Sequence, residues 1–280
     1  MKIIIHGGFF SESSTSEETK ARKQQALKEI VTKGFYYLQQ HSAVETVAYT
    51  VQLLEDDPLF NAGTGSQIQS DGTIRMSAAL MDGHHIRFGG VMNIEKVKNP
   101  VLVAQKLLPL EDTVLSGFGA TLFARRKGLD SFNPELKERR TEFEQKKEDT
   151  RISTVGCVCI DAQGHIAVAT STGGKGFELP GRVSDSATVA GTYANTYCGV
   201  SLTGVGEDIV RNAMAAKIVT RVTDGMELQQ AFDKTFNELK STGGFAGAIA
   251  VDHLGNVYHQ ESHPLMVFAS YDGIDYKVFK

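Results

Sequence analysis

The chain has 280 residues, of which 41% are hydrophobic and 22% charged; these values are near the averages for folded proteins, so wholesale disorder is excluded. Its net charge of −4 offers the phosphates of nucleic acids no broad basic surface, so we expect no nucleic-acid partner. No run approaches the ~18 consecutive apolar residues of a membrane span, and the apolar run after Lys2 is too short for a signal-peptide core.

The first part of the chain predicts a buried strand followed by two helices. Residues 2–5 are Lys2 and three isoleucines, which predicts a short buried strand ending at a Gly-Gly turn. Thr15 with Glu18 has the form of a capping box, and Ser42 with Glu45 forms a second one. Each box precedes apolar residues at steps of three and four, so each predicts an amphipathic helix.

The middle of the chain predicts short strands and then a charged segment. Residues 66–69 and 75–80 are expected to be strands around a turn at 70–72. A helix is expected near 97–108. Residues 133–151 are mostly charged, which is typical of a solvated helix or a mobile linker.

The last part predicts two hairpins separated by helices. The expected strands are 154–160 with 165–170, and 246–251 with 256–260; the expected helices are 207–222 and 226–240. Cys157 and Cys159 fall on one face of the first of these strands, and with Cys198 they lack zinc-ribbon spacing. We interpret all three as small buried side chains of a reduced, cytoplasmic protein.

This order of elements predicts an α+β fold. Hairpin-linked strands favour mainly antiparallel sheets with helices in blocks, so we expect a four-layer αββα sandwich rather than a parallel doubly wound sheet. The whole chain, 1–280, is expected to form one domain.

A series of short motifs follows the charged segment. Thr154-Val155-Gly156 opens the strand, and four further motifs come after it. They are Thr170-Ser171-Thr172-Gly173-Gly174, Leu179-Pro180-Gly181-Arg182-Val183-Ser184-Asp185-Ser186, Gly191-Thr192-Tyr193-Ala194-Asn195 and Thr203-Gly204-Val205-Gly206-Glu207. With His6-Gly7-Gly8, Phe60-Asn61-Ala62-Gly63-x-Gly65 and Met81-Asp82-Gly83 in the first half, the series resembles the plant-type asparaginase and isoaspartyl aminopeptidase family of N-terminal-nucleophile hydrolases, from end to end.

The resemblance implies that the chain cuts itself between Ser153 and Thr154. Residues 1–153 would then form one subunit, with the charged linker at about 133–153, and residues 154–280 the other. The chemistry agrees, because a threonine hydroxyl needs an adjacent base, and a free α-amino group has a pKa of ~7.7–8.0. Cleavage would create that amine on the residue that carries the hydroxyl.

Roles for other residues also follow from the resemblance. Thr172 would hydrogen-bond to the nucleophile, and Thr203 with Gly204 would form the oxyanion hole. Arg182 would bind the α-carboxylate of the substrate and Asp185 its α-ammonium group. Asn61 and Gly206 would contact or orient the substrate. Without the resemblance, Arg182 and Asp185 are equally readable as a surface ion pair three residues apart.

No catalytic cofactor is expected. The resemblance does imply a structural sodium ion held by main-chain carbonyls in the segment 54–64. The matching residues are Leu54, Glu55, Asp57, Phe60, Ala62 and Thr64. It also implies a homodimer of cleaved protomers.

Three features depart from the family pattern. Phe9-Phe10 stands where the family has a glycine-containing loop, so packing beside the active site is expected to differ. Ser153 precedes the nucleophile where glycine is common, which bears on the rate of self-cleavage. Residues 175–178, Lys-Gly-Phe-Glu, lie in a segment expected to contact the substrate.

The implied activity is hydrolysis of the side-chain amide of L-asparagine and of β-aspartyl dipeptides. Alternatives are a glycosylasparaginase-type amidase, a threonine endopeptidase of the same fold, and an uncleaved relative that serves as a binding module. The endopeptidase is expected to carry a long insert that this chain lacks. A binding module has no need of the threonine, arginine and aspartate residues retained together here.

Overall fold

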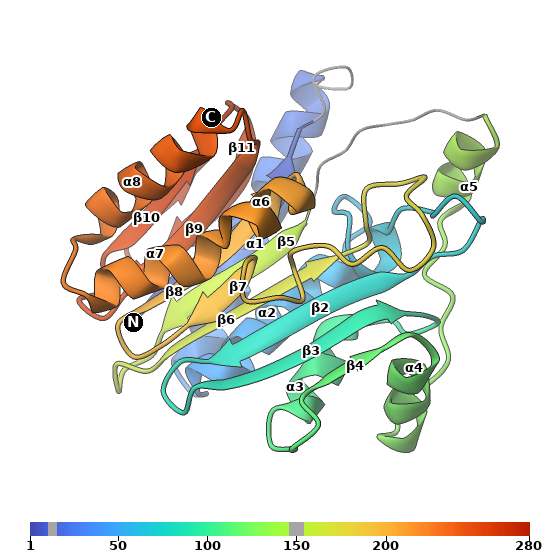
Figure 1. Cartoon of the computed structure of the whole chain (residues 1–280), viewed down its shortest axis with the longest axis horizontal. Coiled ribbons are helices and arrows are strands. Elements are labelled where there is room, and N and C mark those ends of the chain that lie inside the picture. Colours follow the sequence, from blue (N-terminus) through green and yellow to red (C-terminus); the bar gives the residue numbers. More distant parts are fainter. Residues whose placement is uncertain (11–15, 146–153) are drawn as a thin grey trace.

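The computed structural model describes residues 1–10, 16–145 and 154–280, and within these ranges the chain forms four layers (Figure 1). Two sheets face each other, and helices cover the outer face of each. The strands of the larger sheet are, in spatial order, β12 (Tyr276–Val278), β11 (Met266–Tyr271), β1 (Lys2–Phe9), β5 (Val155–Ile160), β6 (Ile166–Thr172), β2 (Met76–Asp82), β3 (Arg87–Ile94) and β4 (Val114–Ser116). All neighbours in this sheet are antiparallel except β3 and β4.

The smaller sheet lies across β5 and β6 of the larger one. Its strands are β10 (Val257–Glu261), β9 (Ala246–Asp252), β8 (Cys198–Gly204) and β7 (Thr192–Ala194), all antiparallel to their neighbours. The predicted αββα sandwich is therefore confirmed.

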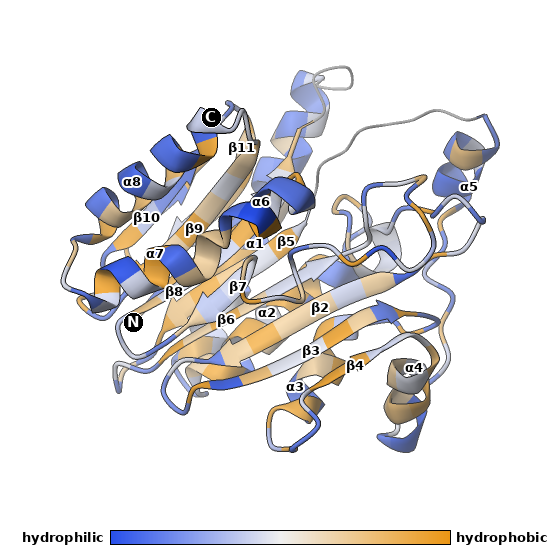
Figure 2. Cartoon of the chain, viewed as in Figure 1, coloured by the Kyte–Doolittle hydropathy of each residue, from blue (hydrophilic) through white to orange (hydrophobic). Residues whose placement is uncertain are grey.

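Helices pack on the two outer faces. The larger sheet is covered by α1 (Glu17–Leu38), α2 (Ala43–Asp56) and α3 (Pro100–Leu107), and α4 (Gly117–Arg126) lies beside its β3–β4 edge. The smaller sheet is covered by α6 (Gly206–Asn212), α7 (Met214–Thr223) and α8 (Leu228–Ser241). Apolar residues concentrate on the strands and on the sheet-facing sides of these helices (Figure 2).

The helix starts agree with the sequence in part. At Ser42 both halves of the predicted capping box are present, and the backbone N–H of Glu45 donates to the Ser42 hydroxyl. The first helix is capped by Ser16, which accepts from the N–H of Thr19, and not by Thr15, which lies outside the described residues.

Three predictions of regular structure were wrong. The first strand does not end at a turn of Gly7 and Gly8 but continues to Phe9, with a shift of register after His6. Residues 66–69 do not form a strand; they continue the loop that follows the short 3-10 helix η1 (Gly63–Gly65). The single helix expected over 207–222 is two helices, because Ala213 adopts the left-handed conformation with φ of 48° and ends α6. Apolar spacing alone carries no signal for that one residue.

The charged segment includes a helix, α5 (Lys137–Glu144), which is not purely solvated. Its Arg139 is buried, donates from Nε to the carbonyl of Gly65 and pairs with Glu142 at 2.9 Å. The helix is thus attached to the loop after α2. The rest of the predicted linker, from 146 to 153, lies outside the described residues.

The cysteine prediction is confirmed in its structural part: Cys157, Cys159 and Cys198 are buried free thiols. Among the helices of the described ranges, none combines the length and apolar character needed to cross a membrane.

Candidate active site

Thr154 stands directly before β5 and is buried between the sheets. Its hydroxyl lies 3.1 Å from that of Thr172, the last residue of the neighbouring strand β6. Its carbonyl accepts a hydrogen bond from Nδ1 of His6 on β1, at 2.9 Å. Both the side chain and the main chain of Thr154 are therefore held by strands that flank β5 in the larger sheet.

His6 connects Thr154 to the smaller sheet. The ring is completely buried, and burial lowers the pKa of His6 to about 3, so the imidazole is neutral. Nδ1 carries the hydrogen because its partner is a carbonyl, which leaves Nε2 to accept from the hydroxyl of Ser201 at 2.9 Å. Ser201 is in turn 2.7 Å from the hydroxyl of Thr170. Any side chain at Gly156 would collide with Ser201 and His6, which explains the glycine in Thr-Val-Gly.

Sequence reasoning used His6 only as part of a motif and missed Ser201 and Thr170. A histidine before Gly-Gly at the end of a buried strand was the available signal. The partner of its Nδ1, Thr154, is 148 positions away in the chain, so no local pattern could have identified that contact.

Thr203 lies on the same face of β8 as Ser201, because side chains two apart on a strand point to the same side. Since Ser201 reaches His6 of the larger sheet, Thr203 also points between the sheets. Its hydroxyl is buried and has no hydrogen-bond partner within the described part of the chain. Gly204 next to it has a φ of 142°, and a Cβ there would lie 2.5 Å from the carbonyl oxygen of Phe245. Position 204 therefore requires glycine, and the Thr203 hydroxyl is a buried donor without a partner between the two sheets, within the described residues.

Arg182 and Asp185 meet at Gly206. A Cβ on Gly206 would lie 2.9 Å from both Nη2 of Arg182 and Oδ1 of Asp185. Asp185 is 3% exposed, and its Oδ2 has no hydrogen-bond partner among the described residues. It is also packed against Gly191, whose carbonyl accepts from the N–H of Leu202 beside Thr203. A buried carboxylate with a free oxygen is thus close to the Thr203 segment.

The ion pair of Arg182 is with Glu207, not with Asp185. Nε and Nη2 of Arg182 donate to the two carboxylate oxygens of Glu207 at 2.7 and 2.9 Å. These hydrogen bonds lower the pKa of Glu207 to about 2. Lys175, from the segment 175–178, lies 4.0 Å from the same carboxylate. The sequence did not identify Glu207 as the partner of Arg182. The available signal was that Glu207 directly follows Gly206, a residue of the predicted site.

Asn61 holds the turn after Thr172. Its Nδ2 donates to the carbonyl of Gly174 at 2.5 Å, and its Oδ1 accepts from the N–H of Gln67. Its own carbonyl accepts from the N–H of Gly173. The N–H of Gly174 donates to the hydroxyl of Thr172 at 3.2 Å. Asn61 therefore orients the loop that fixes Thr172.

The segment expected to hold a cation joins α2 to the Gly63–Gly65 turn. Its members run from the end of that helix to the turn: Leu54, Glu55, Asp57, Phe60, Ala62 and Thr64. Gly63 has a φ of 54°, and a Cβ on it would collide with the carbonyl oxygen of Glu55. A Cβ on Gly65 would collide with the carbonyl oxygen of Phe60. The carbonyl oxygens of Glu55 and Phe60 therefore lie against these two glycines. Ser153, the other predicted cleavage residue, lies outside the described residues.

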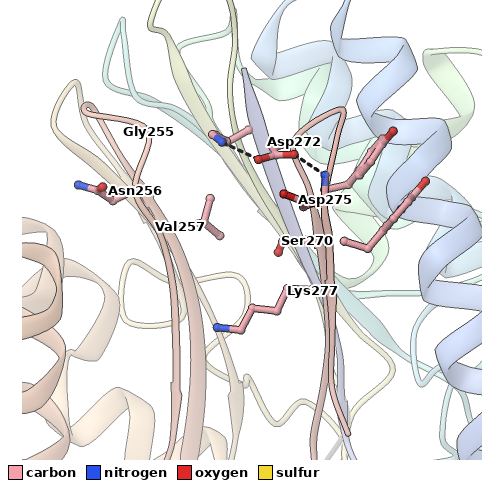
Figure 3. A pocket seen from close by; sticks show the side chains of 10 residues that line it. Gly255, Asn256, Val257, Ser270, Asp272, Asp275 and Lys277 are labelled. Carbon is pink, nitrogen blue, oxygen red and sulfur yellow. Dashed lines mark hydrogen bonds and ion pairs between the residues drawn. The ribbon is translucent and has the colours of Figure 1, made fainter.

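A separate cavity of about 300 Å³ lies between the β9–β10 turn and strands β11 and β12 (Figure 3). Lys2 and Asp272 form an ion pair of 2.8 Å in it, and the N–H of Asp275 donates to the same carboxylate. None of the predicted site residues lines this cavity, and two of its charged groups, Lys2 and Asp272, bind each other. It offers no competing reactive centre.

The fold and the site together define the class of protein. Two facing antiparallel sheets between helix layers, with a buried threonine opening a central strand, form the architecture of the N-terminal-nucleophile hydrolases. Comparison with known sequences is more specific: the model of the asparaginase family matches residues 1–278. The chain belongs to this family.

Relatives cover nearly the whole chain. An isoaspartyl peptidase/L-asparaginase from Synechocystis is 43% identical over 97% of this chain and 88% of its own length. An isoaspartyl peptidase from Escherichia coli is 38% identical over 91% of this chain and 88% of its own. A plant-type L-asparaginase from Pyrococcus horikoshii is 36% identical over 95% of both chains. The fold and these relatives thus agree that the chain belongs to a family of hydrolases.

Proposed function

We propose that this protein hydrolyses the side-chain amide of L-asparagine and of β-aspartyl dipeptides, with Thr154 as nucleophile. The observation that carries the proposal is the position of Thr154: it is buried, its hydroxyl is 3.1 Å from that of Thr172, and His6 holds its carbonyl. Cleavage between Ser153 and Thr154 supplies the α-amine that acts as base.

The reaction then follows from these groups. The amine accepts the proton of the Thr154 hydroxyl as Oγ1 attacks the amide carbon. Thr203 and the Gly204 N–H stabilise the negative charge on the former carbonyl oxygen. When the tetrahedral intermediate collapses, the C–N bond breaks and the leaving amine takes the proton. Water then attacks the acyl ester, and the α-amine of Thr154 again acts as base. Aspartate is released and the Thr154 hydroxyl is restored.

Recognition of the substrate rests on opposite charges around Gly206. The buried Asp185 carboxylate pairs with the α-ammonium group, and Arg182 binds the α-carboxylate. Arg182 keeps Glu207 on one edge of its guanidinium, and Nη1 has no hydrogen-bond partner within the described ranges. Because asparagine and β-aspartyl dipeptides share the same α-carbon groups, one site accepts both.

The activity is expected to decrease as the pH falls through about 7. Burial raises the pKa of Asp185 to about 7, although its backbone N–H and Arg182 act in the opposite direction. Below that pH the carboxyl of the free enzyme is neutral and loses its attraction for the ammonium group. The measurement is kcat/KM for L-asparagine from pH 5 to 9 in the wild type and in Asp185→Asn. The variant is expected to be weak and to show only the ionisation of the Thr154 amine, with a pKa of ~7.7–8.0. A wild-type profile of the same shape as that of the variant contradicts the assignment.

The same ionisation has an opposite effect on stability. A carboxyl whose pKa is raised by folding holds its proton more tightly in the folded chain than in the unfolded chain. Its contribution to stability is therefore largest at low pH and is lost as the pH rises toward 7. Bound substrate, whose ammonium group pairs with the carboxylate, offsets that loss.

We further propose a structural sodium ion in the loop after α2. The carbonyl oxygens of Glu55 and Phe60, which lie against Gly63 and Gly65, suit a hard cation that prefers oxygen ligands. The ligands would be the carbonyls of Leu54, Glu55, Asp57, Phe60, Ala62 and Thr64. When bound, the ion supplies rigidity to the loop that carries Asn61 and takes no part in the chemistry.

We also propose a homodimer. Phe118 on α4 is 81% exposed, and Val114 of the edge strand β4 and Leu122, one turn further along α4, are also exposed. Such apolar side chains on one edge suit burial in an interface. Light scattering is expected to give twice the chain mass of 30.4 kDa. A fully active species at the mass of one chain contradicts the dimer.

Two measurements test the proposed function. Intact-mass spectrometry of aged protein is expected to find fragments 1–153 and 154–280 in place of the full chain. Assays with L-asparagine, β-Asp-Leu and a glycosylated asparagine, run side by side, are expected to give hydrolysis of the first two. An active but permanently uncut chain contradicts the mechanism, and preference for the glycosylated substrate favours the glycosylasparaginase alternative.

The compartment we propose is the cytoplasm. The buried free thiols of Cys157, Cys159 and Cys198 suit this reducing environment.

A further inference from the structure

Three aromatic rings form a row from the core to the surface, which we call the aromatic row: Phe9, Phe245 and His263. The centroids of Phe9 and Phe245 are 4.6 Å apart in an edge-to-face arrangement. The rings of Phe245 and His263 are stacked, also at 4.6 Å. Phe9 is buried, Phe245 half-buried and His263 exposed. Phe9 belongs to the departure from the family pattern noted in the sequence.

The inner end of the row borders the Thr203 segment. Thr203 is directly opposite Gly247 in the β8–β9 ladder, so the two residues face the same side of the smaller sheet. A Cβ on Gly247 would lie 2.8 Å from Cζ of Phe9, which places the Phe9 ring over that face. The carbonyl of Phe245 accepts from the N–H of Val205, directly after Gly204. The row therefore begins beside the proposed oxyanion hole.

The loop that carries His263 is held in a strained conformation. Leu265 has a φ of 83°, in the left-handed region that disfavours a branched side chain. The N–H of Met266 donates to the carboxylate of Glu261, and the hydroxyl of Ser262 accepts from the N–H of Ala246 and contacts Nδ1 of His263. These contacts fix His263 against Phe245. Backbone strain of this kind persists where the surroundings impose it, and it is common at binding sites.

Two carboxylates lie near the row. That of Asp208 forms an ion pair with Arg211 and accepts from the N–H of Phe245, whereas that of Glu261 accepts from the N–H of Met266. A backbone N–H does not neutralise Glu261, so the preference of the row rests on its ring surfaces and not on an absence of charge. An apolar or aromatic side chain would find three ring surfaces.

We infer that the aromatic row is the binding site for the leaving residue of β-aspartyl dipeptides and that it favours aromatic and branched aliphatic side chains. The inference rests on the proposed function. Arg182 and Asp185 hold the aspartyl part at Gly206, which follows Thr203–Gly204 in the chain, whereas the row lies across the ladder from Thr203. Both sites therefore border the Thr203–Gly204 segment, where the scissile carbonyl would be bound. The ammonia released from asparagine has no group that reaches the row.

The test compares kcat/KM for β-Asp-Phe, β-Asp-Lys and L-asparagine in matched variants of the self-cleaved enzyme. Phe245→Ala is expected to reduce efficiency toward β-Asp-Phe by roughly three- to tenfold while asparagine is unaffected, the loss lying mainly in KM. Phe245→Leu is expected to recover part of it. His263→Ala, at an exposed position that folding does not require, is expected to act in the same direction.

His253→Ala is the matched control, because His253 is also exposed, in the β9–β10 turn, and rests on a different ring, that of Tyr197. It is expected to change no ratio of substrates. Equal losses toward β-Asp-Phe and asparagine in the Phe245 and His263 variants, or unchanged ratios, overturn the inference and leave the proposed function standing. A wild-type enzyme that hydrolyses none of the three substrates refutes the proposed function itself.

Discussion

Replacing Thr154 by alanine is expected to abolish both self-cleavage and hydrolysis while the fold is retained. In the proposed mechanism one hydroxyl is the nucleophile in both reactions, first on the carbonyl before it and then on the substrate. Its loss removes one hydrogen bond, to Thr172, and little packing volume. Intact mass, far-UV circular dichroism and an asparaginase assay on the same sample measure the three properties together.

Two controls sharpen this experiment. Thr154→Ser keeps a hydroxyl and is expected to retain part of both activities. Thr46→Ala removes the same atoms from a buried threonine of α2 whose hydroxyl has no hydrogen-bond partner in the described part of the chain. It is expected to cleave itself and to hydrolyse asparagine normally. Substantial hydrolysis by the Thr154→Ala protein assigns the nucleophile elsewhere.

Replacing Arg182 by alanine is expected to lower kcat/KM by about 30- to 150-fold, which corresponds to the roughly 2–3 kcal/mol of a charge-assisted bidentate contact. Arg182→Lys is expected to recover little, because an ammonium group cannot reproduce the planar fork. The measurement is steady-state kinetics on β-Asp-Leu, with α-linked Asp-Leu as the substrate that should not react.

Glu207 provides the control for Arg182. Its side chain is 48% exposed, so it does not become a buried unpaired charge when Arg182 is removed. Glu207→Gln keeps the shape of the pair and is expected to preserve or improve binding, since the substrate carboxylate then competes with a neutral group. An unchanged kcat/KM in Arg182→Ala means that Arg182 serves only its ion pair with Glu207.

The layers were predictable because their signals are local. The capping box of Ser42 and Glu45 and the turns at 161–164 and 252–255 each depend on residues within four positions. Strands β8 and β11 were not expected, although both are buried, because their identity comes from pairing with distant strands. The apolar pattern is continuous across Ala213, but the left-handed backbone of this residue divides the helix in two.

The sequence motifs identified candidate residues of the site but not the contacts between them. The sequence motifs named Thr154, Thr172 and Thr203, and the structure brings the first two within hydrogen-bond distance. It also adds contacts over long sequence distances, such as His6 to Ser201. The pairing of Arg182 with Glu207 could not be chosen over one with Asp185, because Asp185 is three positions away in the sequence whereas Glu207 is 25 positions away.

The strand order of the larger sheet determines what a cut before Thr154 does to the molecule. Strand β1 is inserted between β11 and β5, and β6 is inserted between β5 and β2, so the two resulting polypeptides are interleaved within one hydrogen-bonded sheet. They cannot separate without withdrawing a central strand from two neighbours at once. Once unfolded, however, they must find each other again, so refolding changes from a single-chain process to a concentration-dependent assembly. The mature enzyme therefore depends for its lifetime on the barrier to unfolding rather than on its ability to refold.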